Sequence, residues 1–153
     1  LARLNLTVVL QDAGRLDESD ELAKVVEEGV MESGDPRLGL GLALQRARGS
    51  RLRSDPLAAI QAGQTAAKKA EAGQQWPLAG RLWVEVGLAL LSQGETADTV
   101  LDTVEQCSIR GSFAPESYEG RASAELRRAV EASRNAEPLR FGWVPEDVPK
   151  GLR

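Results

Sequence analysis

The feature that most constrains the fold is a glycine that recurs at a nearly fixed period. Gly34, Gly73 and Gly111 lie 39 and 38 residues apart, and a proline follows each of them within a few residues. Each glycine comes after a stretch whose apolar residues repeat with the period of an amphipathic helix. A period of this length is typical of stacked helical hairpins, which bury their apolar faces only against one another. The sequence therefore predicts an all-α chain with hairpin units at about 1–34, 35–73 and 74–111.

Start and stop signals divide the chain into about seven helices. Asp35-Pro36 and Asp55-Pro56 each place an N-cap aspartate before a proline at the first helical position. Asp17 is the predicted N-cap of the second helix. The expected helices span about 1–12, 17–34, 36–53, 56–72, 76 to the turn at Gly94, 96–109 and 116–135.

The segment 136–153 interrupts this pattern, because it carries three prolines together with Phe141 and Trp143. Such a composition favours an extended segment over a helix. It is interpreted either as a linker or tail folded back on the helical domain of residues 1–135, or as the entry to a further domain. The chain begins at Leu1, within an apparent helix, so we expect it to be a fragment of a larger protein.

The most specific motif lies on the fifth expected helix. Trp83, Val86, Gly87 and Leu90 fall at i, i+3, i+4 and i+7, which is one face of a helix. This pattern resembles the first-helix signature of the tetratricopeptide repeat, in which a bulky residue, a leucine, a small residue and a tyrosine recur at those spacings. From the residues alone, Trp83 is predicted to be a packing anchor and Gly87 to allow close approach of two helices.

The first unit carries a similar motif. Leu6-Thr7-x2-Leu10 is followed by Gly14, and Ser19 occupies the small position of the next helix. The resemblance covers about residues 1–111 and implies antiparallel hairpins stacked as a right-handed α-solenoid, with helix 116–135 as a cap.

Three departures from the family pattern stand out. The period is longer than that family's usual length. The second unit lacks the bulky and tyrosine-like residues. In the third unit Ala97 comes two residues early, and Thr99 occupies the expected small position.

The residue inventory argues against catalysis. The chain has no histidine and one cysteine, which excludes histidine-based triads and thiolate or histidine cages for zinc. Cys107 lies near the apolar side of its expected helix, so it is predicted to be a buried structural thiol. We therefore predict no catalytic, cofactor-binding or metal-binding residues.

Net charge and hydropathy limit the classes of partner that the chain can have. The formal net charge of −4 argues against nucleic acid as the main partner, because duplex binding depends on phosphate neutralisation. No apolar run approaches the ~20 residues that span a bilayer, so we expect no membrane segment and a cytoplasmic location. The high alanine, arginine and glycine usage hints at a bacterial, GC-rich genome.

Arginines supply the candidate partner-binding residues. Residues 17–32 hold seven acids against the single Lys24, whereas the following helix is rich in arginine. In the family that the chain resembles, the first helix of each hairpin lines a concave groove, which implies that Arg48, Arg51 and Arg81 face it. There they would pair bidentately with carboxylates of a peptide or with phosphate. The alternative is that the arginines pair with the neighbouring acidic helix.

We therefore predict a non-catalytic protein–protein interaction or scaffold module whose groove takes a peptide or helix. One alternative is a ligand- or peptide-sensing regulatory domain of a signalling or transcription-regulating protein. Another is an accessory segment of an enzyme whose catalytic residues lie elsewhere.

Overall fold

The computed structural model describes residues 2–140, with side chains described for residues 2–136, and this part of the chain contains seven α-helices and no strand. The predicted all-α class and helix number are thus confirmed. The helices are α1 (Ala2–Asp12), α2 (Leu16–Ser33), α3 (Pro36–Leu52), α4 (Pro56–Ala72), α5 (Trp76–Ser92), α6 (Asp98–Gly111) and α7 (Tyr118–Arg140).

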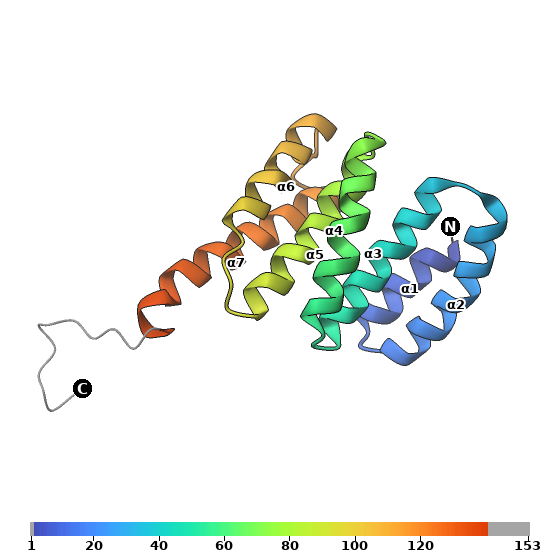
Figure 1. Cartoon of the computed structure of the whole chain (residues 1–153), viewed down its shortest axis with the longest axis horizontal. Helices are drawn as coiled ribbons and strands as arrows, with labels where there is room; N and C mark the ends of the chain where they lie inside the picture. Colours follow the sequence, from blue (N-terminus) through green and yellow to red (C-terminus); the bar gives the residue numbers. More distant parts are fainter. Residues whose placement is uncertain (1, 141–153) are drawn as a thin grey trace, which may run out of the picture.

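The helices follow one another along the length of the molecule, from the α1–α2 pair at one end to α7 at the other (Figure 1). Each helix packs against the next, and the odd-numbered helices also pack against one another: α1 on α3, α3 on α5 and α5 on α7. Within residues 2–140, no comparable contact joins α2 to α4 or α4 to α6. The odd-numbered helices therefore make one continuous layer, and the even-numbered helices cover one side of it.

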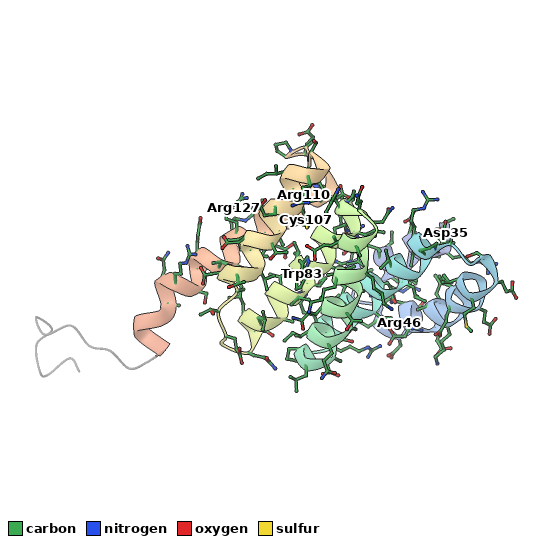
Figure 2. All side chains as sticks on the ribbon, turned by 45° about the horizontal axis from the view of Figure 1, so that its top comes forward. Asp35, Arg46, Trp83, Cys107, Arg110 and Arg127 are labelled. Atoms are coloured by element: carbon green, nitrogen blue, oxygen red, sulfur yellow. The ribbon has the colours of Figure 1, made fainter. Side chains whose placement is uncertain are left out.

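Local capping chemistry explains the best-predicted helix starts. The Asp35 carboxylate, at the turn between α2 and α3 (Figure 2), accepts a hydrogen bond from the Arg37 backbone N–H at 2.9 Å. The Asp55 carboxylate accepts from Ala58 N–H at 3.3 Å. Prolines follow both aspartates at the helix start, where their missing N–H costs nothing.

Two predicted boundaries at helix starts are wrong. α2 begins at Leu16, so Asp17 lies in its first turn and is not the N-cap; its carboxylate instead pairs with Arg53 at 2.8 Å. α6 begins and ends two residues later than predicted. The reason is that Ala97, just before α6, is buried and anchors the helix entry, whereas Thr99 is exposed.

The seventh helix also differs from expectation at both ends. It starts at Tyr118, where the Ser117 hydroxyl accepts a hydrogen bond from Gly120 N–H at 3.0 Å and so acts as a cap. It continues to Arg140 (Figure 1), so residues 136–140 are helical rather than extended. Pro138 lacks the N–H that would donate one helical hydrogen bond, but the helix extends past it to Arg140. The rest of the predicted tail, 141–153, lies outside the described residues.

The hydrophobic core is centred on α5, which packs against α3, α4, α6 and α7. Leu82, Val86 and Trp83 are 0%, 1% and 7% exposed, which confirms Trp83 as a packing anchor (Figure 2). From α7, Leu126 and Val130 complete this core.

Small buried residues mark the helix crossings. Thr7, Ala47 and Gly87 are each buried and lie 40 residues apart on α1, α3 and α5. A Cβ on Gly87 would lie 2.7 Å from Leu126 Cδ1 and 3.3 Å from Val100 Cγ1, which confirms the predicted close approach. The neighbours are therefore α7 and α6 together. At the start of the even-numbered helices, the small residues are equally buried: Ser19, Ala59 and Ala97.

Candidate functional site

Two adjoining hollows lie on the layer of odd-numbered helices. The larger, the apolar hollow, encloses about 850 Å³ and is bounded by α1, α3 and the first turns of α5 and α7. Its apolar lining consists of Leu4, Val8, Val9, Leu38, Gly41, Leu44 and Leu78. Polar and charged side chains complete it: Asn5, Gln11, Asp12, Asp35, Arg37, Gln45, Arg48, Arg81 and Tyr118.

The smaller, the basic hollow, encloses about 320 Å³ over α5, between α3 and α7. It is lined by Leu44, Arg48, Arg51, Arg81, Val84, Glu85, Tyr118, Arg121, Ala122, Glu125 and Arg128. The two hollows share Leu44, Arg48, Arg81 and Tyr118, so they adjoin, and together they are called the groove.

The three arginines predicted from the sequence all line the basic hollow. Arg48 and Arg51 lie three residues apart on α3 and so share a face of that helix. Arg81 comes from α5. The structure thus brings these side chains of α3 and α5 to one hollow.

A buried carboxylate holds two of these arginines in place. Glu85 of α5 is 7% exposed and accepts a hydrogen bond from Arg51 Nε at 2.5 Å. The Nε atom of Arg48 lies 4.0 Å from the other Glu85 oxygen, and Arg48 also pairs with Asp12 of α1. Arg48 and Arg51 therefore join α1, α3 and α5, and much of their charge is already neutralised within the fold.

The electrostatic balance at Arg48 shows the same pairing. Burial by itself lowers the pKa of Arg48, but the hydrogen bond with Asp12 and the nearby charges of Asp12, Tyr118 and Glu85 raise it. The net result is a pKa above the ordinary arginine value, so Arg48 stays cationic in the groove.

The alternative pairing with the acidic helix holds for other arginines of α3. Arg46, labelled in Figure 2, pairs with Glu27 of α2 at 2.7 Å, and Arg53 pairs with Asp20 of α2 at 2.6 Å. The arginines of α3 therefore divide by helix face. Two neutralise α2, while Arg48 and Arg51 lie in the groove.

Tyr118 lies between two further cations. The Arg81 guanidinium is 4.2 Å from the centre of the Tyr118 ring, and that of Arg121 is 5.7 Å from it. Both distances fall within cation–π range. Within residues 2–136, no carboxylate lies within ion-pair distance of Arg81, Arg121 or Arg128. These three arginines are therefore the cations of the basic hollow available to a ligand.

Arg121 and Arg128 were not predicted from the sequence. The available signal was the spacing of Tyr118, Arg121, Glu125 and Arg128 at i, i+3, i+7 and i+10, which places all four near one face of α7. That spacing shows that the four residues share a face of α7, but it does not show which helices this face lies next to. The groove could therefore not be inferred from it.

Among the described residues, the lining of the two hollows contains no cysteine or histidine. Cys107 lies on α6 (Figure 2), is 1% exposed and does not line either hollow. Burial, with a smaller contribution from Glu71, raises the pKa of its thiol to about 11. Within the described residues, no group of three acidic or cysteine side chains is placed to hold a metal ion. What the groove offers chemically is anion pairing beside apolar surface.

A buried polar network fixes the α1 end of the groove. Gln45 Nε2 donates to Ser19 Oγ at 3.2 Å, and Ser19 Oγ donates to the Thr7 carbonyl at 3.0 Å. Gln11 Nε2 donates to the Gln45 carbonyl at 2.8 Å. These bonds tie α1, α2 and α3 together behind the apolar hollow.

Comparisons of the chain with protein-family models, curated proteins and solved structures gave no match. In the described part of the chain, no helix combines the length and apolarity needed to cross a membrane.

Proposed function

We propose that this chain is a non-catalytic protein–protein interaction module that binds a peptide or helix of a partner in the groove. The observation that carries the proposal is that the two hollows adjoin at Leu44, Arg48, Arg81 and Tyr118. An elongated site with an apolar part and a cationic part suits a chain segment, which can present both kinds of side chain.

We further propose that the helices are a divergent tetratricopeptide-like, right-handed α-solenoid within a larger cytoplasmic regulator. The alternating contacts of the odd-numbered helices support this reading. So does the spacing of Thr7, Ala47 and Gly87, because equivalent crossing points recur at a constant interval. In such an arrangement the first helices of the hairpins would line the groove.

The test is selection of groove-binding peptides from a random displayed library, followed by two tryptophan variants. Asn5→Trp adds bulk to an exposed lining position of the apolar hollow, and Leu57→Trp adds the same bulk to an exposed position on α4 outside the groove. We expect selected peptides to lose affinity for Asn5→Trp and to keep it for Leu57→Trp. Equal affinity for both variants would reject the groove.

Charge reversal of Arg48 and Arg51 is a poor test of partner binding. Either reversal would place a new carboxylate beside the buried Glu85, so a loss of binding would follow from damage to the fold. Variants of the three unpaired arginines separate binding from folding.

A second candidate function is a ligand-sensing regulatory domain. A third hollow of about 980 Å³ lies between α3 and α4, adjoins the apolar hollow at Asp35 and Arg37, and is otherwise lined mainly by small and apolar residues such as Gly39, Leu40, Ala43 and Ala62. A small-molecule screen that raises the melting temperature, with loss of the effect in Ala62→Trp, would favour this candidate.

A further inference from the structure

We infer that the groove selects a partner segment carrying two acidic side chains beside an apolar one. This inference rests on the proposed function and specifies the chemistry of its partner. The two hollows would read the two halves of the segment, with the apolar residue towards α1 and the acidic pair towards α7.

The charge of the basic hollow carries the first step. Five arginines and two glutamates line it, although the whole chain has a formal net charge of −4. Glu85 and Asp12 are already engaged by Arg48 and Arg51. Among the residues whose side chains are described, the cations left to a ligand are Arg81, Arg121 and Arg128, and the one acid of the hollow that opposes them is Glu125. A ligand with two negative charges therefore matches the remaining excess.

The position of Glu125 decides how those two charges are arranged. Glu125 lies between Arg121 and Arg128 on the same stripe of α7, and these arginines are seven residues apart, or about 10 Å along the helix axis. A single dianionic group placed midway would face the Glu125 carboxylate. Two separate carboxylates can flank Glu125 and each meet one guanidinium. The arrangement therefore favours an acidic pair over one phosphate.

The apolar hollow determines where the apolar residue of the partner segment binds. Val9 of α1 is 59% exposed and Leu38 of α3 is partly exposed, and both line the apolar hollow. An aliphatic or aromatic side chain bound there would bury apolar surface and so add binding free energy to that of the charge pairs. Because the two hollows adjoin at Leu44 and Tyr118, one segment that lies across these residues would reach both.

The experiment uses the random displayed library and three forms of the chain. We expect peptides enriched on the parent protein to carry two acidic residues within one or two helical turns, next to an apolar residue. The same selection on Arg121→Gln/Arg128→Gln should lose the acidic enrichment. Arg127→Gln is the matched control, because Arg127 lies on the same helix (labelled in Figure 2) but pairs with Glu105 of α6.

Synthetic versions of an enriched peptide then test the chemistry by titration. Replacing its acidic pair with glutamines should weaken binding at least tenfold, and Glu125→Gln in the protein should tighten binding of the acidic form. A peptide in which one phosphoserine replaces the pair should bind less tightly than the acidic form. Tighter binding of the phosphoserine form would overturn the inference in favour of a phosphorylated partner.

The results of these experiments distinguish failure of the acidic-pair inference from failure of the proposed peptide-binding function. Peptides that lose affinity for Asn5→Trp but bind equally with glutamines in place of acids would overturn the acidic pair and leave the peptide groove standing. Selected peptides that ignore Asn5→Trp, or a library that yields no enrichment, would overturn both.

Discussion

Gly87 of α5 and Leu126 of α7 are in direct van der Waals contact: a Cβ added to the glycine would lie 2.7 Å from the leucine Cδ1. Leu126 is completely buried, so it has little room to move away. We predict that Gly87→Leu overpacks this crossing and lowers the free energy of unfolding by about 1–3 kcal/mol. Gly87→Ala should cost less, because one methyl group displaces only the end of a leucine side chain. Chemical denaturation of both variants measures the difference, and a parent-like midpoint for Gly87→Leu would reject the placement.

A second prediction contrasts two glycines within helices. A Cβ on Gly120 would overlap the carbonyl oxygen of Ala114, which is backbone and cannot rotate away, whereas a Cβ on Gly29 meets nothing within 4 Å. Gly120→Ala should therefore destabilise the protein by about 3 kcal/mol or unwind the first turn of α7. Gly29→Ala should stabilise it by about 0.5–1 kcal/mol through helix propensity. Thermal melts followed by circular dichroism test both, and shifts of the same sign would contradict this account.

A third prediction concerns the ion pair beneath the groove. Arg51→Met would leave the Glu85 carboxylate, which is 7% exposed, with only the more distant Arg48 as a partner. We expect a loss of about 1–3 kcal/mol, because an unpaired buried charge is costly. Adding Glu85→Met should recover part of that loss. A double-mutant cycle measures the coupling, and additive effects would show that the pair does not hold α3 to α5.

A fourth prediction follows from the raised pKa of Cys107. The thiol has a pKa of about 11 in the folded chain, against an ordinary value near 9. Between these values the unfolded chain loses its thiol proton and the folded chain keeps it. The contribution of Cys107 to stability is therefore fully present below pH 9 and is lost as the pH rises towards 11.

The reactivity of the same thiol is a direct check. At pH 9 the native protein should react with a thiol reagent much more slowly than the unfolded chain. Since the sequence contains one cysteine, the signal has a single source. Native labelling at the unfolded rate would contradict the burial of Cys107.

The helices were predictable wherever the determining interaction is local. Asp35 and Asp55 set their helix starts through hydrogen bonds to residues two or three positions later, and such contacts are visible in the sequence. The start of α2 was not predictable in this way. Arg15 precedes it without a side-chain cap, and Asp17 is used in a distant pair with Arg53. The start of α6 depends on burial of Ala97, which is also a property of the packed structure.

For the candidate site, the sequence offered a different kind of signal, which covered part of the lining of the basic hollow. Arg48, Arg51 and Arg81 were selected because a repeat resemblance assigns a face to each first helix. Arg121 and Arg128 were missed, because their role depends on α7 packing against α5 and not on their own neighbours in sequence. The neutralisation of Arg48 by Asp12, 36 residues away, could not be seen from composition either.

The most direct test of the central claim is a map of where a selected peptide binds. Backbone amide chemical shifts of the isotopically labelled protein should be followed during titration with one enriched peptide. The account predicts that the shifted amides concentrate on α1, α3, α5 and α7, around Leu44, Arg81 and Tyr118. Changes concentrated on α2, α4 and α6, with the groove unaffected, would contradict it.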